Sequence, residues 1–519
     1  MTAAEQGDFP ALIPWPAELA QTGATYELTA QTSIATGAGT EAIASLLHDE
    51  LSVTTGLSLP VAAADATDSI KLAIDSALPH EGYRLAVAGD GVTIVGGDAA
   101  GVFYGTRTLR QLMPPQNYGG SPEGVRWLVA GVAITDQPAF GWRGSMLDVG
   151  RNFQPKEFVL RYIDLLALHK FNVLHFHISE DQGWRIEIRR YPKLTEVGAW
   201  RSGTLIGRPN RTDPSQDRYD DVRHGGFYTQ EEIREIVSYA AARFVTVVPE
   251  IDLPGHSQAA IAAYPELGNT GKQIEVGRTW GIIEDVLNVE ESTVQFFKNV
   301  FDEIFELFPS TFIHVGGDEC PKVQWKASPR AQELMKERGL SNEDELQSWF
   351  IGQLDKYFAE KGRRLIGWDE ILEGGLAENA AVMSWRGIEG GIEAAKAGHD
   401  VVMAPTTHVY FDYYQSEDQD NEPLAIGGYL PLSKVYEFQP VPPELADVSE
   451  RVLGSQFQLW SEYLPTAAQV EYMAFPRGCA VAEVVWSKER QSYDDFLARL
   501  RLHLERLDAL EVGYRPLDR

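Results

Sequence analysis

The sequence of 519 residues has few cysteines: only Cys320 and Cys479 are present, and they lie far apart in the chain. Two widely spaced cysteines exclude a disulfide framework and match no zinc-binding spacing. We therefore expect a pair of free, buried thiols. Nothing in the cysteine pattern predicts a metal, and we expect the protein to work without a cofactor.

Long apolar runs and positive charge are also scarce. No run approaches the ~18 residues of a membrane span, and Met1 to Pro16 has neither the basic nor the apolar region of a secretory signal. The 75 acidic residues outnumber the 45 basic ones, and the net charge of −30 repels nucleic-acid phosphates and anionic membranes. We expect no nucleic-acid or membrane partner, and a cytoplasmic protein unless a leader has been removed, in which case it is secreted.

The composition that remains is that of a globular protein, with 44% hydrophobic and 23% charged residues. The length predicts two domains. Residues 1–138 mix the two periodicities and are predicted to form a small α+β domain, with a boundary where Asp136 and Pro138 break the pattern. Its predicted helices are Thr40–Val53 and Ala99–Met113, and its predicted strands are Ser69–Ile74, Tyr83–Val87, Val92–Gly96 and Trp127–Ile134.

Residues 139–519 have a different pattern, in which short apolar runs alternate with amphipathic segments. This order favours parallel strands joined by right-handed helical crossovers, and eight units predict a (β/α)₈ barrel. An open doubly wound sheet is the alternative, but no G-x-G-x-x-G follows any run. The runs are Gly144–Val149, Asn172–Ile178, Phe244–Glu250, Phe312–Gly316, Leu365–Trp368, Val382–Trp385, Val401–Ala404 and Ser455–Trp460.

Three local patterns refine the barrel. Thr229 and Glu232 form a capping-box pattern before a helix. The polar stretches Ser202–Val222 and Thr406–Pro443 are too long for simple connections and are predicted to be functional loops over a site.

Acids and aromatic residues recur at the ends of these runs, where barrel enzymes carry their catalytic groups. One such acid commonly caps a helix, and one tryptophan is commonly core, but their repetition at one rim indicates a site. Carboxylates bind hydroxyls and rings stack on sugar faces, so the pattern favours a neutral, hydroxyl-rich ligand. The ends are Glu180-Asp181, Glu250-Ile251-Asp252, Asp318-Glu319, Trp368-Asp369-Glu370, Trp385-Arg386, Tyr410-Phe411-Asp412 and Trp460-Ser461-Glu462.

The motif His314-Val315-Gly316-Gly317-Asp318-Glu319 resembles the signature of glycoside hydrolase family 20, the β-N-acetylhexosaminidases of bacterial type. Segments around Asp181, His256, Trp368 and Trp460 match the family in the same order, and the resemblance covers the whole chain. It implies an exo-acting, retaining enzyme that removes terminal GlcNAc or GalNAc. In this family the acetamido group of the substrate is the nucleophile, and an oxazolinium intermediate forms.

The resemblance also implies roles at the reacting centre. Glu319 is expected to be the general acid/base, and Asp318 to bind the acetamido N–H. Tyr410 is expected to bind the acetamido oxygen. Asp181 and His256 correspond to a pair that lies behind the acid and tunes its pKa.

Further residues are expected to hold the sugar. The resemblance assigns Trp368, Trp385 and Trp460 to the walls of the acetamido pocket. It assigns Arg143, Asp412 and Glu462 to the sugar hydroxyls. Arg143 lies near the start of its run rather than the end, so only the resemblance supports its assignment.

Several alternatives stay open. A related exo-enzyme that releases a disaccharide, a β-glycosidase without N-acetyl preference and a non-catalytic sugar-binding barrel are rivals, although the last is expected to have lost Asp318 or Glu319. His175 and His177 alternate as metal ligands can, but no third ligand shares their spacing. His314 is expected to be structural. The natural substrate, the gluco or galacto preference and the choice between monomer and homodimer are not decided by the sequence.

Overall fold

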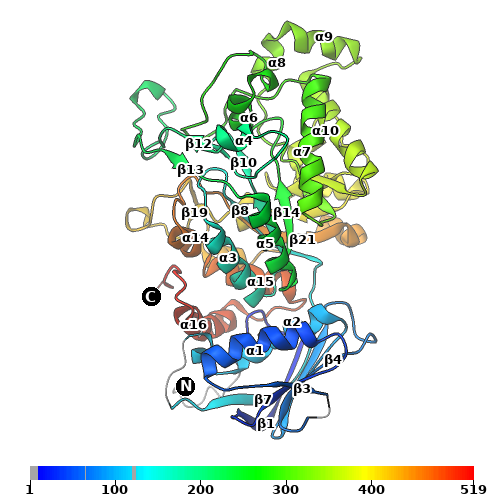
Figure 1. Cartoon of the computed structure of the whole chain (residues 1–519), viewed down its shortest axis with the longest axis vertical. Coiled ribbons are helices and arrows are strands. Elements are labelled where there is room, and N and C mark those ends of the chain that lie inside the picture. Colours follow the sequence, from blue (N-terminus) through cyan, green and yellow to red (C-terminus); the bar gives the residue numbers. More distant parts are fainter. Residues whose placement is uncertain (1–9, 65, 120–123, 519) are drawn as a thin grey trace.

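The structure is a computed structural model that describes residues 10–64, 66–119 and 124–518. Residues 1–9, on which part of the expectation about a leader rests, lie outside this range. The chain forms an N-terminal α+β layer at one end and a larger barrel at the other (Figure 1). The boundary predicted between residues 138 and 139 falls in the connection between the last strand of the first part and the first strand of the second.

The N-terminal part is a seven-stranded mixed sheet in the order β1-β7-β5-β6-β4-β2-β3. The predicted helices and strands of this part are each found within two residues, whereas β1, β2 and β3 were not predicted. Most of the first half of β1 is exposed, which explains its weak pattern. The elements are β1 (Glu18–Leu28), β2 (Ser33–Thr36), α1 (Glu41–Thr55), β3 (Val61–Ala63), β4 (Ser69–Ile74), β5 (Tyr83–Ala88), β6 (Gly91–Gly96), α2 (Ala99–Leu112) and β7 (Trp127–Asp136).

Helix α2 lies between this sheet and the barrel (Figure 1). Every residue from Gly101 to Leu112 is buried, as a helix covered on both sides requires. The side chain of Asp98 caps its first turn by accepting a hydrogen bond from Gly101 N. On the barrel side, the ring of Phe103 contacts that of Phe244, and Tyr104 contacts Trp486. The N-terminal part is therefore packed firmly against the base of the barrel.

The second part is a closed barrel of eight parallel strands, so the (β/α)₈ prediction is confirmed and the open doubly wound alternative is wrong. Each of the eight predicted runs overlaps one barrel strand. The first strand begins at Trp142 and the last at Val452, two and three residues earlier than predicted. The strands are β8 (Trp142–Asp148), β9 (Val173–His177), β14 (Thr246–Glu250), β15 (Phe312–His314), β16 (Arg364–Trp368), β17 (Ala381–Ser384), β18 (Val401–Met403) and β21 (Val452–Leu459).

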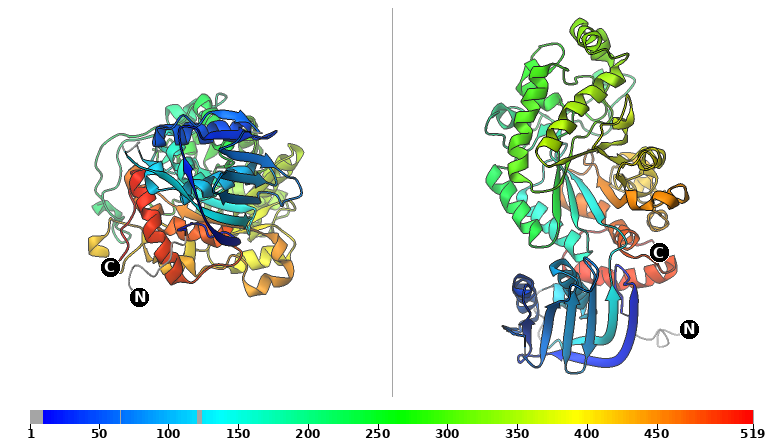
Figure 2. Two further views of the ribbon diagram at one scale, coloured as in Figure 1. Left: turned by 90° about the horizontal axis from the view of Figure 1, so that it is seen from below. Right: turned by 90° about the vertical axis from the view of Figure 1, so that its right-hand side faces the viewer.

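The helices that follow these strands wrap the barrel (Figure 2). Thr229 caps α5 as predicted, because its hydroxyl accepts from Glu232 N while the Glu232 carboxylate accepts from Thr229 N. Only a short 3₁₀ turn, η4 (Asp369–Leu372), connects β16 to β17. The main helices are α3 (Lys156–Leu168), α5 (Gln230–Ala241), α7 (Glu291–Leu307), α10 (Glu343–Glu360), α11 (Glu389–Lys396), α15 (Arg477–Trp486) and α16 (Tyr493–Ala509).

The two predicted long loops leave the C-terminal ends of strands. Residues 202–223 form an arm whose base is closed by pairing of β12 (Trp200–Arg201) with β13 (His224–Gly225). The segment between β18 and β21 contains the parallel pair β19 (Tyr413–Tyr414) and β20 (Gly427–Tyr429). Among the helices of the described ranges, none is both long and apolar enough to cross a membrane.

Candidate active site

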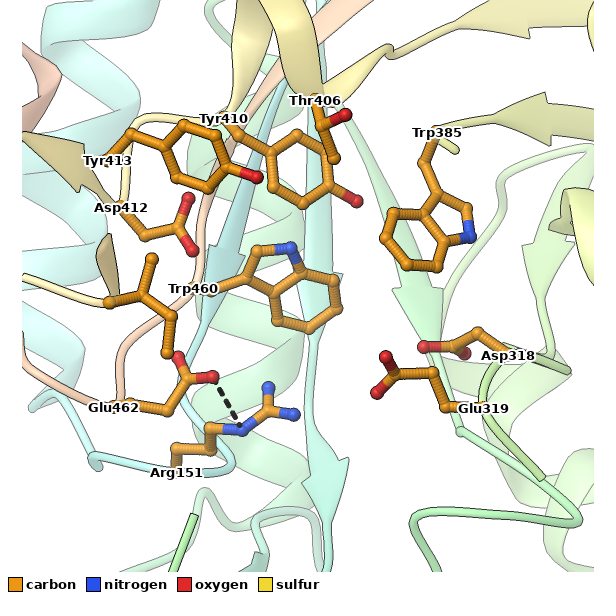
Figure 3. Close-up of a pocket in the computed structure, with 11 residues that line it drawn as sticks. Arg151, Asp318, Glu319, Trp385, Thr406, Tyr410, Asp412, Tyr413, Trp460 and Glu462 are labelled. Carbon is orange, nitrogen blue, oxygen red and sulfur yellow. Dashed lines mark ion pairs between the residues drawn. The ribbon is translucent and has the colours of Figure 1, made fainter. Parts of the chain in front are cut away.

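A cavity of about 180 Å³ opens at the C-terminal ends of the barrel strands. Sites for drug-sized ligands usually measure about 300–1,000 Å³, so this one suits a single monosaccharide unit. Figure 3 shows Asp318 and Glu319 on one side and Asp412 and Glu462 on the other, with aromatic rings between them. The lining residues are Arg151, Asp318, Glu319, Trp385, Thr406, Tyr410, Asp412, Tyr413, Ile426, Trp460 and Glu462.

The turn after β15 explains why glycines precede the two acids. Gly316 and Gly317 have φ of 67° and 93°, a region that favours glycine. A Cβ on Gly316 would lie 1.7 Å from an oxygen of Asp252. Glu319 itself has φ 45°, a strained conformation of the kind that proteins keep at functional sites.

The two adjacent acids differ in their electrostatics. Burial raises the pKa of Asp318 to about 6, and the charges of Glu250 and Glu319 add to this while His256 opposes it. Burial also raises the pKa of Glu319, but the hydrogen bond and the charge of His256 outweigh it and leave the pKa below its usual value. The Glu319 side chain is 34% exposed, so a ligand would bury it further and raise its pKa.

His256, predicted to lie behind Glu319, contacts both acids. Its Nε2 is 3.5 Å from Glu319 Oε2 and 3.8 Å from Asp318 Oδ2. Its Nδ1 is 3.4 Å from Asp181 Oδ2 and 3.0 Å from Glu180 Oε1. Burial lowers the pKa of His256, but these carboxylates raise it well above its usual value. The imidazolium is therefore a fixed positive charge beside Glu319 that favours the ionised form of that carboxyl group.

Both sides of the cavity present carboxylate oxygens that lack partners within the described residues. Within the described residues, the buried oxygens Asp318 Oδ1, Asp412 Oδ1 and Glu462 Oε2 have no hydrogen-bond partner. Unpaired buried acceptors are costly. Burial and the charge of Glu462 raise the pKa of Asp412 well above its usual value. A ligand rich in O–H and N–H donors would satisfy all three oxygens.

Aromatic rings form the walls between these acids. Trp385 stacks at 6.0 Å on Tyr410, and its indole N–H donates to Glu370. Trp460 lines the cavity, with the Arg151 guanidinium 4.9 Å above its ring. Trp368, also predicted for these walls, is 1% exposed and is not among the lining residues; its ring centroid lies 5.7 Å from that of Trp460.

The assignment of Arg143 to the substrate is wrong. Because β8 begins at Trp142, Arg143 lies at the opposite end of the barrel from the cavity. Its guanidinium is fully buried and bonds Glu81 of the N-terminal part at 2.7 and 3.0 Å, and also the Tyr104 hydroxyl. Arg143 therefore anchors the two parts of the chain to each other.

Arg151 occupies the position that was predicted for Arg143. It follows the end of β8 by three residues, lines the cavity, and its Nε is 3.6 Å from Glu462 (dashed in Figure 3). Its other nitrogens bond Glu180 at 2.6 Å and Asp148 at 3.2 Å. The strand-end rule, applied to the first run as to the others, would have found Arg151, and Glu180 belongs to the same network.

His175, His177 and His314 lie inside the barrel around the carboxylate of Glu250. The carboxylate contacts all three rings and accepts from Trp368 Nε1. Burial lowers the pKa of His175 to about 4, whereas the charge of Glu250 overcomes burial and raises that of His177 to about 10. His314 is thus a buried core histidine that does not line the cavity.

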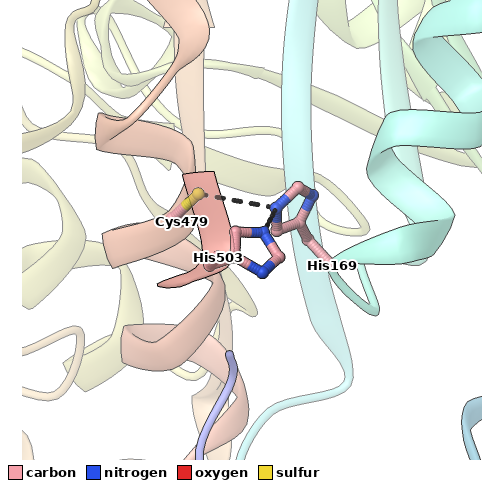
Figure 4. A group of neighbouring side chains, drawn as sticks. All are labelled: His169, Cys479 and His503. Carbon is pink, nitrogen blue, oxygen red and sulfur yellow. Dashed lines mark hydrogen bonds between the residues drawn. The ribbon is translucent and has the colours of Figure 1, made fainter. Parts of the chain in front are cut away.

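A second histidine cluster lies at the base of the barrel, where His169, Cys479 and His503 meet (Figure 4). Arg506 donates to His503 Nδ1, so His503 Nε2 carries a proton and donates it to His169 Nε2 at 2.9 Å. His169 Nδ1 then donates to Leu165 O. The ring nitrogens of both histidines, which a metal ion would need as ligands, are therefore engaged in hydrogen bonds.

Both cysteines are free. Cys479 is buried, as expected. Cys320 is only partly buried, which corrects the expectation for that residue.

The rim of this parallel barrel surrounds a cavity that has room for one sugar. Two neighbouring acids, aromatic walls and carboxylate oxygens without hydrogen-bond donors among the described residues line it. Such a site is that of a glycoside hydrolase. Comparison with known proteins agrees. The family model described as glycosyl hydrolase family 20, catalytic domain, matches residues 140–489, and domain 2 of the same family matches residues 9–137. The chain belongs to glycosyl hydrolase family 20.

Individual relatives support the same assignment. A Porphyromonas gingivalis protein named beta-hexosaminidase is 44% identical over 97% of this chain, which spans 64% of that relative's length. The family 20 β-N-acetylhexosaminidase of Streptomyces coelicolor A3(2) is similar in structure, with a TM-score of 0.85 and 32% identity over 98% of both chains. A Vibrio harveyi exo β-N-acetylglucosaminidase bound to N-acetylglucosamine has a TM-score of 0.85 and 31% identity, covering 98% of this chain and 78% of that one.

Proposed function

We propose that the protein is an exo-acting, retaining β-N-acetylhexosaminidase that removes terminal, non-reducing N-acetylhexosamine units. The observation that carries this proposal is the cavity itself: it has room for one sugar and has unpartnered carboxylate oxygens at both ends. Membership of the family and the N-acetylglucosamine bound to the Vibrio harveyi relative support the choice of sugar.

Asp318 positions the nucleophile. Its buried Oδ1 has no partner within the described residues and accepts the acetamido N–H in this proposal. The acetamido carbonyl oxygen then attacks C1 as the bond from C1 to the leaving oxygen breaks. Tyr410 contributes a hydroxyl from the neighbouring wall to the acetamido oxygen. The negative charge of Asp318 stabilises the oxazolinium that results.

Glu319 moves the proton. It protonates the leaving oxygen as the first bond breaks, and it later takes a proton from the water that attacks C1 and opens the oxazolinium. Two inversions at C1 give net retention. His256, 3.5 Å from Glu319, tunes the pKa of Glu319 between its acid and base roles, and the Asp181 carboxylate lies 3.4 Å behind the imidazole.

Three residues hold the far end of the sugar. Arg151 donates to hydroxyls, while Asp412 and Glu462 accept from them. Arg151 is 3.6 Å from Glu462, close enough for both to contact one hydroxyl. A wall at this end blocks a further sugar unit, and this supports the exo action.

The test compares Glu319→Gln with the wild type on two N-acetyl-β-glucosaminides, one with a p-nitrophenyl and one with a simple alkyl leaving group. We expect kcat to fall by about 10²–10⁴ on the alkyl substrate and much less on the p-nitrophenyl one, because a good leaving group needs little protonation. Equal losses on both would refute the acid role. The plain β-glucoside is the control: comparable wild-type activity on it would mean an enzyme-borne nucleophile.

A further inference from the structure

Arg208 connects the arm of residues 202–223 to the wall of the cavity. Its guanidinium donates to the backbone oxygens of Ile426 at 2.5 Å and Ala425 at 2.6 Å. The same group lies 3.4 Å from the Tyr414 hydroxyl and 5.6 Å from the ring centroid of Tyr463. The two segments are more than 200 residues apart in sequence.

The segment that Arg208 holds forms the wall opposite the catalytic acids. Ile426 lines the cavity, and its N–H donates to Asp412 O at 3.2 Å. Asp412 lies across the cavity from Asp318 and Glu319 (Figure 3). This wall therefore meets the end of the sugar that is remote from the scissile bond.

We propose that Arg208 is a positioning residue that fixes this far wall. Its hydrogen bonds to residues 425 and 426 determine how well the site discriminates between sugars that differ in their remote hydroxyls. The inference rests on the proposed function and deepens it. An arginine suits this task because its planar fork reaches two carbonyl oxygens at once, which the single ammonium of lysine does not.

Release of the two carbonyls would leave Ile426 and Asp412 free to shift outward. Bound sugar would then lose contacts at its remote end, while the reacting centre on the other side would keep its geometry. The expected signature is weaker binding and weaker discrimination between the C4 epimers, with little change in the chemical step.

The experiment measures kcat and KM of the full chain on p-nitrophenyl N-acetyl-β-glucosaminide and on its galacto epimer. We expect Arg208→Ala to raise KM about tenfold, as when one or two hydrogen bonds are lost, with kcat within about threefold. The ratio of kcat/KM for the two epimers should move toward one, and Arg208→Lys should restore part of the loss. Arg218→Ala, which removes an exposed arginine of the same arm, is the matched control.

Three outcomes would overturn the proposal: an unchanged KM and epimer ratio in Arg208→Ala, a loss confined to kcat, or an equal effect of Arg218→Ala.

A wild type that hydrolyses neither epimer would instead overturn the proposed function. Calorimetric titration with N-acetylglucosamine would then test Arg208, with about tenfold weaker binding to Arg208→Ala expected; equal binding, or none to the wild type, would also overturn it.

Discussion

Arg143 and Glu81 form a buried ion pair between the barrel and the N-terminal part, and Arg143→Met separates its structural role from the substrate role suggested by family resemblance. The variant leaves the Glu81 carboxylate buried without its guanidinium. Removal of one member of a buried pair costs about 3–5 kcal/mol. For 519 residues the unfolding entropy is about 1.1 kcal/mol/K, from ~2.1 cal/mol/K per residue, so the midpoint of thermal unfolding should fall by about 3–5 °C.

The assay pairs calorimetric unfolding with kinetics on p-nitrophenyl N-acetyl-β-glucosaminide. KM should stay within about twofold of the wild type, because Arg143 is at the opposite end of the barrel from the cavity. The double variant Glu81→Gln/Arg143→Met should recover part of the lost stability, since no charge is then left unpaired. A tenfold rise in KM with unchanged unfolding would refute the structural role.

The contribution of the Arg143–Glu81 pair to stability should also depend on pH. Although burial raises the pKa of Glu81, the hydrogen bonds and charge of Arg143 lower it below its ordinary value near 4.5. A lowered folded-state pKa contributes stability above the unfolded value, and this contribution is lost as the pH falls through the folded-state value. The difference in stability between the wild type and Glu81→Gln should therefore shrink below about pH 4.5.

Two further predictions concern the cavity. Arg151→Met should lower kcat/KM about 100-fold or more, because it removes a charged donor that binds the sugar and leaves Glu180 and Glu462 facing each other; a loss below about threefold in a folded variant would contradict that role. Because Asp318 must be ionised to bind the acetamido N–H and its pKa is raised to about 6, kcat/KM should fall below about pH 6, and Asp318→Asn should abolish most activity together with that acid limb. An acid limb that persists unchanged in Asp318→Asn would have to belong to another group.

Much of the site was readable from the sequence because strand ends in a barrel converge on one rim. Seven predicted residues line the cavity: Asp318, Glu319, Trp385, Tyr410, Asp412, Trp460 and Glu462. His256 and Asp181 were also predicted correctly as the pair behind Glu319. The positions at strand ends follow from periodicity, a local property of the chain, whereas the pairing of Asp181 with His256 and the roles of these residues came from the resemblance to family 20.

Arg143 and Arg151 show where local patterns fail. Both arginines flank one strand, and only the start of β8 at Trp142 decides that one guanidinium faces the N-terminal sheet and the other faces the cavity. Trp368 likewise ends a strand at the rim, yet its ring is only 1% exposed and packs beside Trp460. Which of two nearby side chains reaches a site depends on neighbours far away in sequence.

The sequence by itself determined the alternation of strands and helices, the two-part organisation and the acids at the rim, because these depend on side-chain periodicity and spacing along the chain. Only the tertiary structure decided the depth of the cavity, the charge balance around His256 and the closure of the far wall by Arg208. Those features arise from contacts between segments up to several hundred residues apart, and packing, desolvation and charge pairing between such segments have no local signature.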